Sequence, residues 1–393
     1  MSARLCALAA LLLGSAVCNA GDIPTALGWH ELPNTRIRSV CPSPAQYPEI
    51  QGVEGCSAVT EDWSGAAFDA VNDRMFITGG GHGGYAGNEV YLLDLNTLTM
   101  SRINEPSRPV RDGCLFNGTY ADGRPVSRHT YAHLAYLSGV NRIFLAGGSR
   151  WQCGFFIGDA WTFDPAADVW VEKSYANGPR VGFGLSLAVD PHSGLVYAHD
   201  DFDLYSYDPA ADQWTRRAQN QQGPGDYKAG VIDPSRRRYF YYAEADRTLY
   251  WYDISDPTGM LTRQSGPTSG CTFMDTYAAG WEYDPVLDRL VAWIGGDTVY
   301  LLDPETRACT TVAYPGGPAA VNNGTFGRFR YSPVSQAYVT CNDVDDNCYA
   351  LRLSPWDTIF ADGFETGGTS ARNLVVPFHE PVLPARSIVL GPD

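Results

Sequence analysis

One histidine stands among six glycines in residues 78–88, TGGGHGGYAGN. An imidazole in an exposed loop can exchange protons near neutral pH, contact a ligand or bind a metal. A phosphate loop needs a helix directly after its glycines, so that the helix N-terminus meets the anion. The next residues, NEVYLLDL, are typical of a strand, which argues against phosphate binding. We therefore expect a tight hairpin with His82 and Tyr85 at its tip, as ligand contacts or as loop residues without a role.

Other side chains suited to a polar ligand occur in short, turn-rich segments. They are Arg150 and Trp151 in SRWQCGF, Asp200 and Asp201 in HDDFD, Asp226 and Lys228 in GDYKAG, and Glu244 in EADR. Aromatic residues also recur five or six positions before an apolar position of a repeat, at Trp63, Tyr131, Phe183, Tyr227, Tyr277 and Phe326. Sugar rings stack on aromatic faces while carboxylates accept bonds from their hydroxyls. The alternative is that the aromatic set packs between structural elements.

Six similar segments indicate the elements that carry these residues. The segments are FDAVNDRMF (68–76), YLSGVNRIF (136–144), VDPHSGLVY (189–197), IDPSRRRYF (232–240), YDPVLDRLV (283–291) and YSPVSQAYV (331–339). Each has apolar residues eight positions apart with turn-forming residues between them, which is typical of strand, turn and strand. The repeat length fits one four-stranded propeller blade per copy.

A second pattern follows within the units, in VYLLDLNTLTM, AWTFDPAADVW, LYSYDPAADQW and VYLLDPETRAC. Glycine pairs end a strand at 79–80, 147–148 and 295–296, and an aromatic residue precedes Trp170 or Trp214 by nine positions. This order resembles the Kelch repeat of galactose oxidase-like β-propellers, over residues 29–353. Met100 and Cys309 replace the tryptophan in two units, and the third, fourth and sixth units lack the glycine pair. The resemblance implies an all-β, six-bladed propeller whose loops bind ligands on one face.

The sixth unit has three strand-like stretches, RFRYSPV, AYVTCND and CYALRL. An isolated strand-like piece, GWHELPN, lies at residues 28–34. Pairing this N-terminal strand with the last blade would cover both sheet edges. We therefore expect six blades of four antiparallel strands, closed by the N-terminal strand.

The ends of the chain differ from the repeats. Residues 1–20 carry an early arginine, a short apolar run and a small-residue ending, which is typical of a signal peptide. We expect a propeller domain over 21–354 and a C-terminal extension over 355–393. The stretch WDTIFADGFE in that extension resembles a C-terminal segment of some secreted Gram-negative proteins. The expected location is secreted or periplasmic, with no membrane span.

Cysteine content agrees with that location. Eight cysteines follow the expected signal peptide, and an even number in a secreted chain indicates disulfides. Cys341 and Cys348 flank a turn and should face each other across a hairpin. Further expected pairs are Cys41–Cys56 and Cys114–Cys153.

The net charge of the chain limits the classes of partner that we expect. The formal net charge is −16, with only two lysines, so nucleic acid is not an expected partner. The segment NDVDDN (342–347) is rich in oxygen ligands but lacks the full spacing of a calcium loop. Copper of the galactose oxidase type would need a histidine arrangement near the chain end that is not seen. No cofactor is expected.

Two classes of function remain open. The favoured one is a binding module for carbohydrate or a protein surface. The alternative is a sugar-processing enzyme, either copper oxidase-like or similar to the periplasmic N-acetylneuraminate epimerases. The latter would pair Glu89 or Glu244 with Arg150 or Arg180 for acid–base work. Nothing in the sequence selects one such pair, and the fold alone does not give function.

Overall fold

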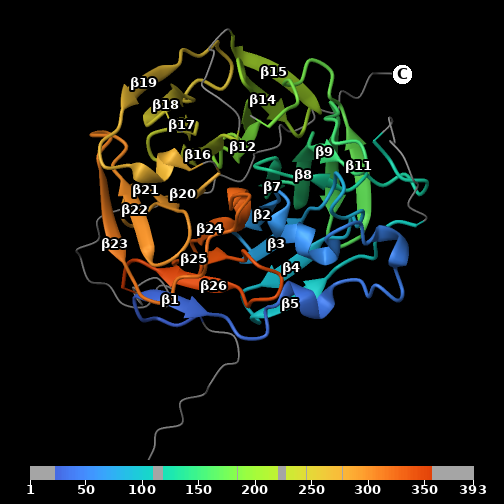
Figure 1. The fold of residues 1–393 in the computed structure, drawn as a ribbon. Coiled ribbons are helices and arrows are strands. Elements are labelled where there is room, and N and C mark those ends of the chain that lie inside the picture. Colours follow the sequence, from blue (N-terminus) through green and yellow to red (C-terminus); the bar gives the residue numbers. More distant parts are fainter. Residues whose placement is uncertain are drawn as a thin grey trace, which may run out of the picture. The chain divides into compact units, whose positions relative to one another are not determined.

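Six four-stranded antiparallel sheets form a ring around a central axis (Figure 1), as the repeats predict. The computed structural model describes residues 23–108, 118–183, 185–219, 227–244, 246–276 and 278–355. In the first five blades, the first strand lies nearest the centre and the last lies at the rim (Figure 1). The expected fold class is confirmed.

Each of the first five blades is one continuous stretch of chain. The first blade consists of β2 (Gly65–Asp69), β3 (Arg74–Thr78), β4 (Tyr91–Asp94) and β5 (Thr99–Arg102). The second consists of β7 (Leu134–Leu137), β8 (Arg142–Ala146), β10 (Ala160–Asp164) and β11 (Val169–Lys173). The third consists of β12 (Ser186–Val189), β13 (Val196–His199), β14 (Leu204–Asp208) and β15 (Gln213–Ala218). The fourth blade consists of β16 (Ala229–Asp233), β17 (Arg238–Tyr242), β18 (Thr248–Asp253) and β19 (Gln264–Pro267). The fifth consists of β20 (Gly280–Asp284), β21 (Arg289–Trp293), β22 (Thr298–Leu302) and β23 (Cys309–Ala313).

The sixth blade joins the two ends of the propeller. It combines β24 (Phe329–Ser332), β25 (Ala337–Thr340) and β26 (Tyr349–Arg352) with β1 (Gly28–Glu31). β1 pairs antiparallel with β26, with Trp29 opposite Leu351. The expected closure by the N-terminal strand is therefore confirmed, and Figure 1 shows β1 at the rim of this blade.

Short elements connect the blades. They are the two-stranded pair β6 (Arg128–His129) and β9 (Ser149–Arg150), the helix α1 (Ala58–Glu61) and the 3₁₀ turns η1 (Ile37–Val40), η2 (Pro48–Ile50), η3 (Gly55–Ser57), η4 (Thr272–Asp275) and η5 (Phe326–Arg328). No helix of the described residues is long and apolar enough to cross a membrane.

The recurrent aspartates of the repeats set the hairpin turns. Asp69 accepts hydrogen bonds from the backbone N–H groups of Val71 and Asn72 through Oδ1. Asp233 and Asp284 make the same type of turn in other blades. A carboxylate that bonds the backbone two and three residues later stabilises a tight turn. The same local geometry thus forms the hairpin turn in different blades.

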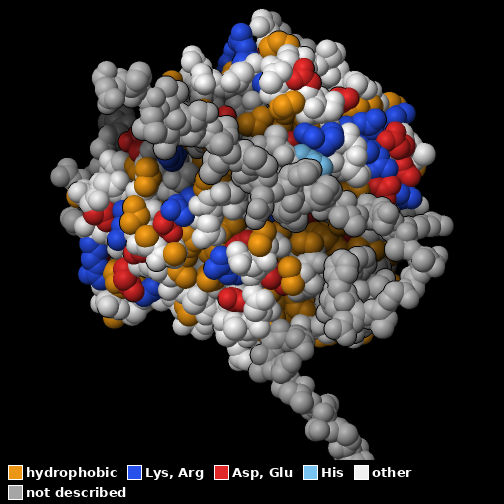
Figure 2. Space-filling view, turned by 180° about the vertical axis from the view of Figure 1, so that it is seen from behind, with side chains coloured by type: hydrophobic (Ala, Val, Ile, Leu, Met, Phe, Trp, Pro, Cys, Tyr) orange, Lys and Arg blue, Asp and Glu red, His pale blue; other side chains and the backbone are white. Residues whose placement is uncertain are grey.

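The hydrophobic core lies between adjacent blades. One cluster joins Phe144 of β8 to Tyr207 and Trp214 of the third blade, with the Phe144 and Tyr207 rings 4.5 Å apart. Charged side chains are scattered over the surface (Figure 2). Seen from behind, basic and acidic groups lie next to one another rather than in separate patches (Figure 2). Arg236 shows the same mixing, with ion pairs to three carboxylates.

Three disulfides are formed among the described residues. The expected pairs Cys41–Cys56 and Cys341–Cys348 are confirmed. A third pair, Cys271–Cys309, was not predicted, because its cysteines are 38 residues apart, one in the connection that enters the fifth blade and the other on β23 of that blade. The Cys114–Cys153 prediction falls outside the described residues, since Cys114 belongs to the range 109–117.

Candidate functional site

Five of the innermost strands are entered through an unusual backbone turn in the described part of the chain. Five residues before the apolar anchor of a repeat, φ is positive at Trp63, Tyr131, Tyr227, Ala278 and Phe326. Such values are costly for bulky side chains and persist only where the surrounding structure enforces them. The turns bring four of the aromatic residues to the same end of the central channel. In the fifth blade, alanine takes this position, and Tyr277 lies outside the described residues.

An aromatic cluster is centred on Tyr131, whose side chain is buried. Its ring centroid lies 5.6–6.2 Å from those of Phe156, Phe183, Tyr227 and Phe326. Phe183 is 36% exposed, and Tyr227 and Phe156 are half-buried. Tyr131 therefore fills the channel, while its neighbours leave ring surface accessible from outside.

His82 lies beside this cluster on a fixed backbone. Its N–H donates to the carbonyl of Arg150 at 3.1 Å, and its own carbonyl accepts from Gln152. A Cβ at Gly154 would approach the His82 imidazole to 2.9 Å, so glycine there leaves the space that the ring occupies. The side chain is exposed even though φ is 41°. The loop thus holds a solvent-facing imidazole in one place, as the sequence predicted.

His129 lies beneath the exposed surface, next to His82. Its ring stacks on Trp63 at 5.1 Å and meets His82 edge-on at 6.0 Å. Nε2 lies 3.8 Å from Oδ2 of Asp62, and Nδ1 lies 3.3 Å from the Tyr131 hydroxyl. A Cβ at Gly84 would come within 1.9 Å of the Asp62 carboxylate, which explains one glycine of the GGGHGG loop.

Burial keeps this histidine and aspartate neutral. Desolvation lowers the pKa of His129 to about 3, with a further contribution from His82. Desolvation also raises the pKa of Asp62 to about 8, together with a hydrogen bond to and repulsion from Glu54. A neutral carboxyl can donate a hydrogen bond, and a neutral imidazole can accept one. At neutral pH the pair therefore offers hydrogen-bonding groups without net charge.

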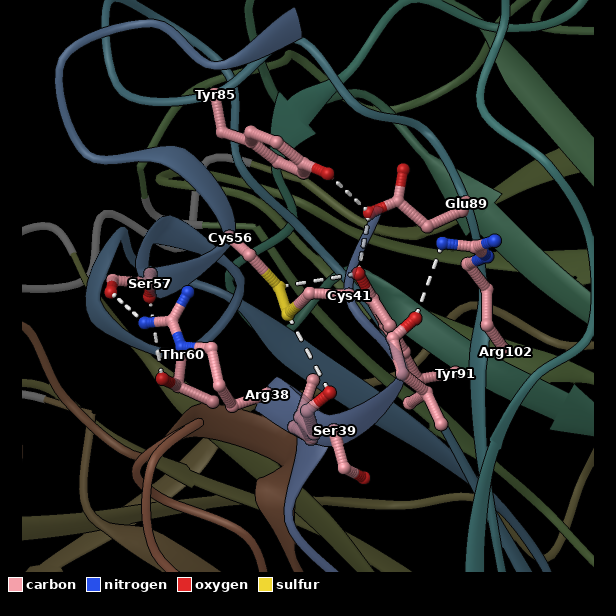
Figure 3. Close-up of a disulfide and its surroundings, with 12 residues drawn as sticks. Arg38, Ser39, Cys41, Cys56, Ser57, Thr60, Tyr85, Glu89, Tyr91 and Arg102 are labelled. Carbon is pink, nitrogen blue, oxygen red and sulfur yellow. Dashed lines mark hydrogen bonds between the residues drawn. A yellow bond between two sulfur atoms is a disulfide. The ribbon is translucent and has the colours of Figure 1, made fainter. Parts of the chain in front are cut away.

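Tyr85 is buried below the loop rather than at its tip. Its hydroxyl and that of Tyr91 both donate to Oε1 of Glu89, at 2.7 and 2.6 Å (Figure 3). The Tyr91 hydroxyl also lies 3.3 Å from the sulfur of Cys56, which is bonded to Cys41. The apolar ring of Tyr85 can be buried in the core because Glu89 accepts a hydrogen bond from its hydroxyl there. Glu89 itself is 2% exposed, and desolvation raises its pKa.

We predict that Glu89→Gln removes a pH-dependent loss of stability. Because the folded-state pKa of Glu89 is raised, its contribution is full below the unfolded value near 4.5 and is lost as pH rises through the folded pKa. Between pH 4.5 and pH 8 the variant should therefore lose less of its free energy of unfolding than the wild type does. Urea unfolding of both proteins at the two pH values measures this. An unchanged difference between them would contradict it.

The other candidate residues divide between core and surface. Trp151 belongs to the core and Arg150 is 4% exposed, with Nε donating to the carbonyl of Phe155. Glu244 is exposed on its loop, and Asp226 lies outside the described residues. The predicted site residues in these turn-rich segments therefore differ in accessibility.

Lys228 and its neighbours form a separate polar group. Its Nζ is 2.9 Å from Oδ1 of Asp201, and the lysine side chain is fully buried. Asp200 accepts backbone hydrogen bonds from Arg180, Phe202 and Asp203, so it organises its hairpin. Burial raises the pKa of Asp200.

Sequence reasoning missed a cleft beside the aromatic cluster. The cleft has a volume of about 190 Å³ and lies between the entries to the first and sixth blades and the β25–β26 hairpin. Its polar lining is Glu61, Asn322, Asn323, Asn342, Asp343, Asp346, Asn347 and Tyr349. The segments 61–63 and 323–326 each run from the cleft to the aromatic cluster, so the two regions adjoin. The segment NDVDDN (342–347) was the part of the cleft that the sequence indicated. The other lining residues come from distant segments of the chain.

Two further residues of the site were also missed. Asp62 directly precedes Trp63, but only the folded chain brings it to His129. Phe156 lies outside the repeat positions, so no spacing indicated it. Within the described ranges, no three His, Cys, Asp or Glu side chains gather as a metal site.

Comparisons with known proteins show similarity in fold. No family model matches the chain, and no curated protein matches it. An auxiliary nutrient binding protein from Bacteroides ovatus ATCC 8483 is similar in structure, with a TM-score of 0.51 and 12% identity over 83% of this chain and 76% of that one. YjhT gives a TM-score of 0.49 and 12% identity, over 75% of this chain and 99% of its own. The chain is thus a β-propeller similar in fold to a nutrient binding protein.

Proposed function

We propose that this β-propeller binds carbohydrate on the face formed by the Tyr131 cluster and the adjoining cleft. The observation that carries the proposal is the exposed aromatic surface around a buried centre. Phe183, Phe156 and Tyr227 offer partly accessible ring faces, and Trp63 lies beside His129. The C–H faces of sugars stack on such rings, and polar groups at the rim can form hydrogen bonds with the sugar hydroxyls.

The polar groups beside the cluster support the same class of ligand. His82 is exposed, and the cleft carries four asparagine amides that can donate and accept hydrogen bonds. A sugar presents hydroxyls that do both. The nutrient-binding description of one structural neighbour is compatible with this function.

The proposal also covers the type of propeller and the division of the chain into segments. We infer a Kelch-type, galactose oxidase-like propeller, because the glycine pairs and Trp170 and Trp214 occupy the repeat positions. We also propose that residues 1–20 form a signal peptide, that 21–354 form the propeller domain and that 355–393 form an extension. Three disulfides fit an oxidising compartment.

Binding is tested by calorimetry with oligosaccharides of glucose, galactose, mannose, uronic acids and amino sugars. We expect at least one class to bind, and Trp63→Ala to weaken it by about tenfold, since lost stacking and support of His129 are worth about 1.4 kcal/mol. Trp251→Ala is the matched control, because Trp251 is also half-buried but lies in β18 of the fourth blade. No binding by any class, or equal losses in both variants, would contradict the proposal.

A sugar-processing enzyme is the second candidate, and His82 is the observation that favours it. An exposed imidazole on a fixed, left-handed backbone beside a buried His129–Asp62 pair is suited to proton transfer. The Glu89 role considered above is less suited, because Glu89 is enclosed by tyrosines. NMR of the bound sugar would show conversion that His82→Gln abolishes while binding persists. Unchanged sugar would leave the binding module as the function.

A further inference from the structure

We propose that the ligand is a saccharide with free amino groups, whose ammonium group is held in the cleft next to the aromatic cluster. This inference rests on the proposed carbohydrate binding and names the substrate class of that same face. The cleft is a concave site whose lining includes three carboxylates, Glu61, Asp343 and Asp346. No lysine, arginine or histidine belongs to the described lining.

The carboxylates of the cleft lack a basic partner within it. Arg38 of η1 approaches the hairpin, but its guanidinium donates to both carboxylate oxygens of Asp345 and to the Ser57 hydroxyl rather than to a carboxylate of the cleft. Burial raises the pKa of Glu61, and the charges of Asp343 and Glu54 raise it further, while the charge of Arg38 acts in the opposite direction without reversing the shift. A cationic ligand would relieve this repulsion, whereas an anionic sugar would add to it.

The amides lining the cleft favour a ligand that also carries hydroxyls. Asn342 is 7% exposed and is fixed by bonds to Arg328 and Thr325, and Asn347 is fixed by bonds to Glu31 and Thr35. These side chains are therefore held in place before a ligand arrives, which lowers the entropy cost of binding. The carboxylates supply charge and the amides supply hydrogen bonds.

Continuity with the aromatic cluster favours a saccharide over a simple amine. A volume of about 190 Å³ corresponds to about six water molecules, enough for one sugar ring or one amino-acid side chain. Glu61 lines the cleft two residues before Trp63, and Asn323 lines it three residues before Phe326. A chain of sugar rings could place one ring in the cleft and the next against the aromatic faces.

The test compares tetramers of glucosamine, N-acetylglucosamine and glucose, and lysine amide, by calorimetry on the full chain. We expect the glucosamine tetramer to bind about fivefold or more tightly than the other two tetramers at low salt, and this preference to shrink at high salt. Asp343→Asn with Asp346→Asn should remove the preference. Both carboxylates are exposed, and the Asp343 bond to the Asp345 N–H can be kept by asparagine, so folding should be unaffected.

A control variant removes a carboxylate that lies away from the cleft, and it is compared with the single variant Asp343→Asn, which removes the same charge within the cleft. Glu172→Gln removes one exposed carboxylate from β11, at the rim of the second blade, and should leave the preference unchanged. Equal binding of the three tetramers overturns the amino-sugar inference and leaves carbohydrate binding intact. Lysine amide binding as tightly as the glucosamine tetramer also overturns it, because the cleft would then recognise the amine alone. If no tetramer or other sugar class binds the wild type, the proposed function itself fails.

Discussion

Replacing Tyr131 by alanine is expected to lower the free energy of unfolding by about 3–5 kcal/mol, because the variant leaves a cavity among aromatic rings. Tyr131 is 1% exposed and packs against rings from several blades. The backbone is not the cause of the loss, since Ala278 adopts the same left-handed turn in the fifth blade. Denaturant unfolding measures the change, and carbohydrate binding should fall with it.

Tyr131→Phe is the matched variant for this prediction. Phenylalanine keeps the ring packing and loses only the hydroxyl that lies 3.3 Å from His129. We expect a loss of about 1 kcal/mol, typical of one hydrogen bond. If alanine and phenylalanine destabilised the protein equally, ring packing at the channel centre would not be the source of its stability.

The second large effect is expected at Asp159. Its Oδ1 accepts from Nη1 of Arg128 at 2.7 Å and its Oδ2 accepts from Trp161 at 2.8 Å, and both members of the ion pair are buried. Asp159→Ala leaves the Arg128 guanidinium buried without its counter-charge, which costs about 3–5 kcal/mol. Arg128 forms β6 together with His129, so the variant should also weaken binding at the site. Chemical denaturation and calorimetry measure the two effects.

A double replacement tests the cause. Arg128→Met with Asp159→Leu removes both charges, and buried ion pairs can be replaced by apolar groups at little cost. The double variant should therefore be more stable than Asp159→Ala. Greater damage in the double variant would show that the hydrogen bonds of Arg128 to the carbonyls of Val126 and Gly147, rather than charge balance, hold this region.

The fold could be predicted because its determinants are local and repeated. Each aspartate turn acts over two or three residues, so Asp69, Asp233 and Asp284 mark their hairpins in the sequence itself. Closure could also be predicted, because the sixth unit lacked one strand and residues 28–34 supplied it. The Cys271–Cys309 pair could not, since it depends on how the connection entering the fifth blade packs against the outer strand β23.

The candidate site could be predicted only in part. Trp63, Tyr131, Tyr227 and Phe326 were indicated by their constant distance from the anchors, and the structure brings them to one end of the channel. Tyr85 is buried because Glu89, four residues later, bonds its hydroxyl, a contact that a loop prediction does not include. The cleft combines segments near residues 61, 320 and 345, and no pairwise spacing along the chain encodes it.

The most direct test of the central claim is a crystal structure of the protein with the tightest-binding oligosaccharide. We predict a sugar ring against the faces of Phe183, Tyr227 or Trp63, with its neighbour reaching the cleft lined by Asp343 and Asp346. A sugar bound at the outer rim of the blades, or on the opposite side of the ring, would contradict the claim that the Tyr131 cluster and its cleft form the binding site.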